Sequence, residues 1–118
     1  MKALIACLTF LYIASAMADE GVSGRDMLKK WGMAYCLGTY QTQGPENEAG
    51  TARDGYFQLG SHYEQAYKNV RAYFKRVVPQ DTRIVQGLGK PNNLMRCLDA
   101  YEHRDYSTLI RDQDRWLY

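Results

Sequence analysis

Apolar residues recur at intervals of three and four along most of the chain, which is the spacing of one face of an α-helix. The pattern predicts helices over about residues 25–40, 45–60, 61–78, 91–103 and 107–117. No segment alternates apolar and polar residues as a half-buried strand does. Short connections between the predicted helices favour antiparallel neighbours. We therefore predict an all-α fold, a small bundle of about five helices.

The same spacing predicts which face of each helix is buried. In the third helix these positions are Tyr63, Ala66, Tyr67, Val70, Tyr73, Phe74 and Val77; in the second they are Ala49, Ala52, Tyr56 and Leu59. In the fourth they are Leu94, Leu98 and Tyr101, with Cys97 at the edge of that face. Gly60 is expected to end the second helix as a C-terminal cap. Ser61 and Glu64 have the spacing of a capping box, which would start the third helix.

The first 18 residues are predicted to be a cleaved secretory signal. Lys2 precedes an apolar run over residues 3–14, and Ala16-Met17-Ala18 fits the small-x-small cleavage pattern. The run is shorter than the about 20 residues that a membrane-spanning helix needs. We therefore expect an exported protein without a membrane anchor, in which residues 19–118 form a single domain.

Removal of this leader leaves two cysteines, Cys36 and Cys97. Small domains in oxidising compartments are commonly stabilised by disulfides, and two cysteines allow only one pairing. We therefore expect a disulfide that joins the first helix to the fourth. The alternative is a free Cys36 thiol acting as the nucleophile of a hydrolase, which would need a neighbouring base.

The composition offers little for catalysis. The formal net charge is only +2, without a basic stripe, so nucleic acid and anionic membranes are not expected partners. His62, predicted in the first turn of the third helix, and His103 are the two histidines, and neither lies in a catalytic motif. No cysteine, histidine and carboxylate spacing suggests a metal site. We therefore expect a protein that is not an enzyme and has neither metal nor cofactor.

Aromatic residues and one long connection point instead to binding. The chain has 10 tyrosines and two tryptophans, residue types that anchor protein interfaces. The stretch without helical periodicity is Gln80, Asp81, Thr82, Arg83, Ile84, Val85, Gln86, Gly87, Leu88 and Gly89. This stretch is about as long as an irregular loop becomes in a compact domain without having a function. Its apolar side chains either fold back onto the bundle or are held out for insertion into a partner.

Three stretches stand out together: Lys30–Leu37, then Gly55–Gly60 followed by Glu64–Tyr67, and finally Leu94–Tyr101. Their order and spacing resemble those of the type VI secretion amidase immunity proteins. The resemblance implies a periplasmic helical homodimer that neutralises a peptidoglycan amidase of the cysteine–histidine class. It also implies that a loop between helices enters the groove of the amidase. The loop in the matching position is 80–90. Its apolar residues Ile84, Val85 and Leu88 would fill the groove, and the charge of Asp81 or Arg83 would orient the loop.

Other binding proteins fit the same features. A periplasmic inhibitor of lysozyme or a small envelope chaperone would share the export signal, the disulfide and the aromatic content. A structural envelope protein without a partner is a further alternative.

Overall fold

The computed structural model describes residues 23–41, 48–87 and 89–118. They form a helix over 23–40 and then α2 (Glu48–Gln58), α3 (Glu64–Val77), α4 (Asn93–Glu102) and α5 (Arg104–Asp112), with the short 3-10 helices η1 (Val78–Gln80) and η2 (Gln113–Trp116). Over these ranges there is no β-strand, only an isolated bridge. The prediction of an all-α bundle is confirmed. The predicted signal, residues 1–18, lies outside the described residues, whose helices are too short or too polar to cross a membrane.

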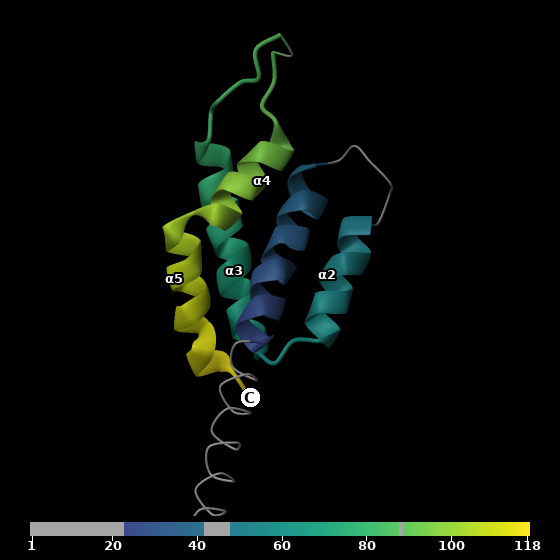
Figure 1. Ribbon diagram of the computed structural model, residues 1–118, viewed down its shortest axis with the longest axis vertical. Helices are drawn as coiled ribbons and strands as arrows, with labels where there is room; N and C mark the ends of the chain where they lie inside the picture. The colour runs from purple at the N-terminus through teal and green to yellow at the C-terminus, as the bar shows by residue number, and fades with distance from the viewer. Residues whose placement is uncertain (1–22, 42–47, 88) are drawn as a thin grey trace, which may run out of the picture.

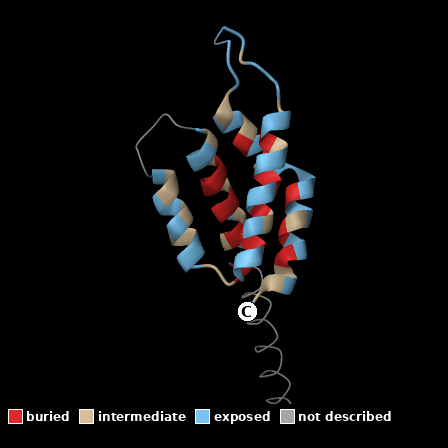
Figure 2. Ribbon diagram, turned by 180° about the vertical axis from the view of Figure 1, so that it is seen from behind, coloured by how far each residue is buried: buried red, intermediate tan, exposed pale blue. Residues whose placement is uncertain are grey.

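The 23–40 helix, α3 and α5 lie side by side, α4 crosses them near the top, and α2 lies on the outer side of the 23–40 helix (Figure 1). The buried positions face inward on these helices, whereas α2 has none (Figure 2). The core is dominated by aromatic rings, and its buried members include Trp31, Tyr67, Tyr73, Phe74 and Tyr106. The apolar stripe predicted for α3 is therefore confirmed at its centre.

Helices α3 and α5 approach the 23–40 helix closely at Gly32. A Cβ atom there would lie 2.6 Å from Val70 Cγ1 and 2.8 Å from Phe74 Cε2, and it would overlap the Tyr106 hydroxyl. That hydroxyl donates a hydrogen bond of 2.7 Å to the Lys29 carbonyl. A residue without a side chain is required at this position, because it lets α3 and α5 pack directly against the backbone of the 23–40 helix.

The predicted capping box at α3 is wrong. Tyr63 is the residue that precedes α3, and no side chain caps the helix. The Ser61 carbonyl instead accepts a hydrogen bond from the Tyr118 backbone N–H, at 3.1 Å. Pairing with the end of the chain holds residues 61–63 extended, so that Tyr63 is 56% exposed rather than buried.

Two other predicted helix ends also differ. Gly60 does not have the positive φ of a C-terminal cap; its missing side chain makes room for the Tyr67 hydroxyl. The fifth helix starts at Arg104, earlier than expected, because the His103 side chain caps it by accepting from the Asp105 backbone N–H at 3.1 Å.

The predicted inner faces of two helices are only partly correct: Tyr56 on α2 and Tyr101 on α4 do pack against the core. In α2, Tyr56 and Ala49 are half-buried, but Ala52 is exposed, as is Leu59 just beyond the helix. In α4 the buried residues are Cys97 and Ala100 rather than the leucines. Two contacts set the rotation of α4: the bond from Cys97 to Cys36 and a hydrogen bond of 2.7 Å from the Tyr73 hydroxyl to the Ala100 carbonyl. The apolar side chains that this rotation leaves exposed are Leu94, Met95 and Leu98.

Candidate functional site

The connection between η1 and α4 projects beyond the ends of the helices, at the end of the bundle far from the C-terminus (Figure 1). We call residues 81–90 the projecting loop. Ile84 is 63% exposed and Val85 is half-buried. Leu88, the third predicted apolar contact, lies outside the described residues. Ile84 therefore does not fold back onto the bundle, which was one of the two expected arrangements.

Backbone geometry gives the projecting loop a defined turn. The Val85 backbone N–H donates to the Lys90 carbonyl at 3.2 Å, which closes the outer part of the loop. Between them, Gly87 and Gly89 have φ angles of 88° and 64°. Other residues rarely adopt these angles, because the Cβ atom then approaches the following carbonyl oxygen.

An ion-pair network ties the base of the projecting loop to α4. Arg83 donates from Nε to Asp81 Oδ1 at 2.9 Å and from Nη2 to Asp81 Oδ2 at 2.6 Å, and the same Nη2 contacts Asp99 on α4. The Arg83 backbone N–H also donates to Asp81, at 3.1 Å. Hydrogen bonds from Arg83 lower the pKa of the Asp81 carboxyl to about 2. Exposed ion pairs add little to global stability, so the main effect is on the orientation of the loop.

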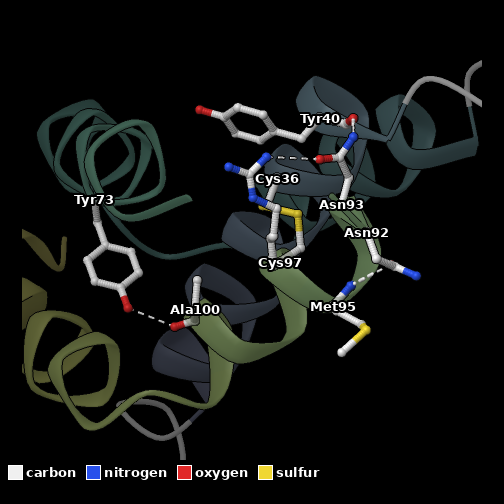
Figure 3. The surroundings of a disulfide bond; sticks show 9 residues. Cys36, Tyr40, Tyr73, Asn92, Asn93, Met95, Cys97 and Ala100 are labelled. Carbon is white, nitrogen blue, oxygen red and sulfur yellow. Dashed lines mark hydrogen bonds between the residues drawn. A yellow bond between two sulfur atoms is a disulfide. The ribbon is translucent and has the colours of Figure 1, made fainter. Parts of the chain in front are cut away.

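The disulfide anchors the point where the loop rejoins the bundle (Figure 3). Cys36 on the 23–40 helix and Cys97 on α4 are both fully buried, with their Cα atoms 5.8 Å apart. Beside them, the Asn93 side chain donates to the Tyr40 carbonyl at 2.6 Å (Figure 3). The predicted pairing is confirmed, and Cys36 is therefore bonded rather than the free thiol that the hydrolase alternative needs.

The start of α4 is also capped. The Asn92 side chain accepts from the Met95 backbone N–H at 3.0 Å (Figure 3), as expected of an asparagine that precedes a helix. Asn92 and Asn93 thus hold the start of α4 in place. Among the described residues of the loop tip, the backbone hydrogen bond runs from Val85 to Lys90, within the loop itself.

An apolar surface lies beside the loop on α4. Leu94, Met95 and Leu98 are 41%, 49% and 42% exposed. They fall within about 100° of arc around the helix, at 3.6 residues per turn, so they form one patch. We call them the α4 patch. The sequence pattern assigned the two leucines to the core, because it placed Cys97 at the edge of the buried face. Placing Cys97 at the centre of that face would have predicted the rotation of α4 correctly.

The structure shows no candidate metal site among the described residues. No group of three or more histidine, cysteine or carboxylate side chains among them could hold a metal ion. His103 caps α5 from the surface. His62 precedes α3, rather than lying in its first turn, and is buried. The exposed features described above are the projecting loop and the α4 patch.

Comparison with known proteins identifies a family. Residues 26–110 match the family model Tai4, described as type VI secretion system amidase immunity protein. The matched segment contains both cysteines, the projecting loop and the α4 patch. No curated protein matches the chain.

Proposed function

Because the chain belongs to the type VI secretion system amidase immunity protein family, we propose that it binds a cognate peptidoglycan amidase and blocks its active site with the projecting loop. The observation that supports this most is that the loop is both exposed and ordered. It extends past the helices, yet Arg83, Asp81 and Asp99 hold its base and a backbone hydrogen bond closes its tip.

The order of the loop matters for affinity. Fixing the backbone of one flexible residue costs about 1–2 kcal/mol, so a disordered ten-residue loop would lose much of its binding energy on insertion. A loop that already has its bound shape avoids most of this cost. In this proposal Arg83 and Asp81 hold the loop in shape, because their charges are already paired within the chain.

Ile84 is the proposed central contact. An isoleucine that moves from water into an apolar groove contributes about 1.5–3 kcal/mol. Its exposure of 63% in the free protein leaves most of that contribution available. Val85 and Leu88 are proposed as neighbouring contacts. Inhibition is then steric: the loop excludes peptidoglycan from the catalytic cysteine and histidine of the amidase, without any reaction of its own.

The α4 patch is proposed to extend this interface. Stable protein complexes bury about 800 Å² on each partner, which is more than the tip of one loop provides. Leu94, Met95 and Leu98 supply apolar area where the loop rejoins the bundle. Continuity between loop and patch would let a single amidase molecule contact both.

We also propose that the protein acts in the periplasm as a homodimer, after cleavage of a signal at residue 18. Peptidoglycan, the substrate of the amidase, lies in that compartment. The buried disulfide is consistent with oxidising surroundings.

The test is inhibition of the cognate amidase, with peptidoglycan as substrate. A variant whose residues 82–89 are replaced by a glycine-serine linker of equal length should keep its helical circular dichroism but fail to inhibit. Ile84→Asp should weaken inhibition about 10- to 100-fold, which corresponds to the about 1.5–3 kcal/mol of one buried isoleucine.

Gln86→Asp is the matched control, because it places the same charge at another exposed position of the loop. It should change inhibition much less than Ile84→Asp. Unchanged inhibition by the linker variant would refute the loop as the blocking element. Inhibition of a lysozyme, without any effect on the amidase, would instead favour the alternative class of periplasmic inhibitor.

A further inference from the structure

The end of the chain closes on the segment between α2 and α3. The Tyr63 backbone N–H donates to the Trp116 carbonyl at 2.7 Å, and the Tyr118 backbone N–H donates to the Ser61 carbonyl at 3.1 Å. Between these bonds His62 and Leu117 form an antiparallel bridge. We call residues 61–63 and 116–118 the C-terminal clasp. The C-terminus lies at the end of the bundle opposite the projecting loop (Figure 1).

His62 is enclosed within the clasp. It is 3% exposed, and neither ring nitrogen has a hydrogen-bond partner among the described residues. Gly24, at the start of the 23–40 helix, packs against it: a Cβ atom there would lie 3.6 Å from His62 Cε1 and 3.1 Å from Leu117 Cδ2. Protein interiors rarely leave a side chain of this polarity unpaired.

The charged group that acts on His62 is Asp114, which is itself paired with Arg25. Arg25, on the 23–40 helix, donates from Nε to Asp114 Oδ1 at 2.9 Å, and its Nη2 contacts Asp114 Oδ2. These bonds lower the pKa of the Asp114 carboxyl and keep it charged. Asp114, on η2, therefore attracts a positive ring through space but makes no hydrogen bond to it.

A neutral imidazole is tolerated in this position, but an imidazolium is not. The charged ring has two N–H donors and no acceptor capacity, and burying a charge without hydrogen bonds is strongly unfavourable. We propose that the C-terminal clasp is an acid-sensitive latch, which opens when His62 takes up a proton. Opening would free residues 116–118 and expose the His62 ring to water.

The pH range follows from the titration of the ring. Burial lowers the pKa of His62 from its ordinary 6.5, and Asp114 offsets part of this effect. Above pH 6.5 the ring is neutral whether the clasp is closed or open, so the clasp keeps its full stability. Below pH 6.5 the open form is protonated first, and the ratio of closed to open molecules falls about tenfold per pH unit until the pKa of the closed form is reached.

Nuclear magnetic resonance on the mature protein tests this directly. The His62 ring should titrate below pH 6.5. Hydrogen exchange at the backbone amides of Tyr63 and Tyr118, corrected for the intrinsic rate and compared with the core amide of Tyr73, should lose protection about tenfold per pH unit below 6.5. The same loss should occur in His103→Asn, which replaces the exposed histidine by another side chain that can cap α5.

His62→Gln should abolish this dependence, because glutamine does not titrate. A His62 ring that titrates at or above pH 6.5 in the closed protein would overturn the proposal. So would an equal pH dependence of exchange in His62→Gln. If that variant does not fold, the ring titration and the exchange of the wild-type protein decide the question alone. The proposal does not depend on amidase binding, since the clasp and the projecting loop lie at opposite ends.

Discussion

The close approach of α3 and α5 to Gly32 predicts that two Gly→Ala substitutions will have opposite effects on stability. Gly32→Ala would place a Cβ atom 2.6 Å from Val70 Cγ1 and 2.8 Å from Phe74 Cε2, whereas carbon atoms in contact are normally about 3.5–4.0 Å apart. Gly55→Ala adds the same methyl group to α2, where nothing lies within 4 Å of the new atom. The first should destabilise the fold and the second should stabilise it.

The size of the effect at Gly32 combines three contributions. Overpacking a core costs about 1–3 kcal/mol. Displacing the buried Tyr106 hydroxyl from the Lys29 carbonyl costs about 1–3 kcal/mol more, if that group is left unpaired. Alanine recovers about 1 kcal/mol through its higher helix propensity. The net loss is about 1–5 kcal/mol, from a total that is about 5–15 kcal/mol for a typical domain.

Urea denaturation followed by circular dichroism measures this difference. Gly32→Ala should lower the midpoint at an unchanged slope, and each kcal/mol should lower Tm by about 4–8 °C in a domain of about 100 residues. Gly55→Ala should raise the free energy of unfolding by about 0.5–1 kcal/mol. If Gly32→Ala were as stable as the wild type, the close approach of α3 and α5 to the 23–40 helix would be wrong.

Two further predictions concern the disulfide and the α4 patch. Changing both Cys36 and Cys97 to alanine should cost about 4 kcal/mol for a sequence separation of 61; equal melting temperatures of the wild-type protein with and without reductant would contradict a stabilising bond. Leu98→Glu should weaken amidase binding about 10- to 100-fold without lowering Tm. The control Ser107→Glu, on the exposed side of α5, should leave binding unchanged. Similar affinities for the two variants would exclude the α4 patch from the interface.

The sequence was sufficient to predict the helices and the core of α3. The stripe from Ala66 to Phe74 is periodic over about two turns and is buried as expected. Such a pattern depends on local spacing alone. The pairing of Cys36 with Cys97 could also be predicted, because there was only one way to join two cysteines.

The remaining features depend on contacts between distant segments. Ser61 has the right spacing for a cap, but its backbone pairs with Tyr118, and that contact is not encoded near residue 61. The rotation of α4 is set by Tyr73 and Cys36 rather than by its own leucines. His62 is buried by the end of the chain, so no local pattern distinguished it from a surface histidine.

The projecting loop was recognised as a gap in periodicity, and its exposure was one of two expected arrangements. Its ion pair with α4 could not be predicted, because Asp99 lies 16 residues from Arg83 and belongs to a helix whose predicted rotation was wrong. The glycines at positions 87 and 89 were visible in the sequence. Their positive φ angles, however, depend on how the loop closes between Val85 and Lys90.

The Cys36–Cys97 bond also determines what happens when the backbone is cut. All of the projecting loop lies between the two cysteines in sequence, within the covalent ring that they close. Exposed loop tips are preferred sites of proteolysis. A cut at Ile84 would therefore produce two polypeptides that stay joined through sulfur, and the nicked molecule would migrate as separate fragments only after reduction.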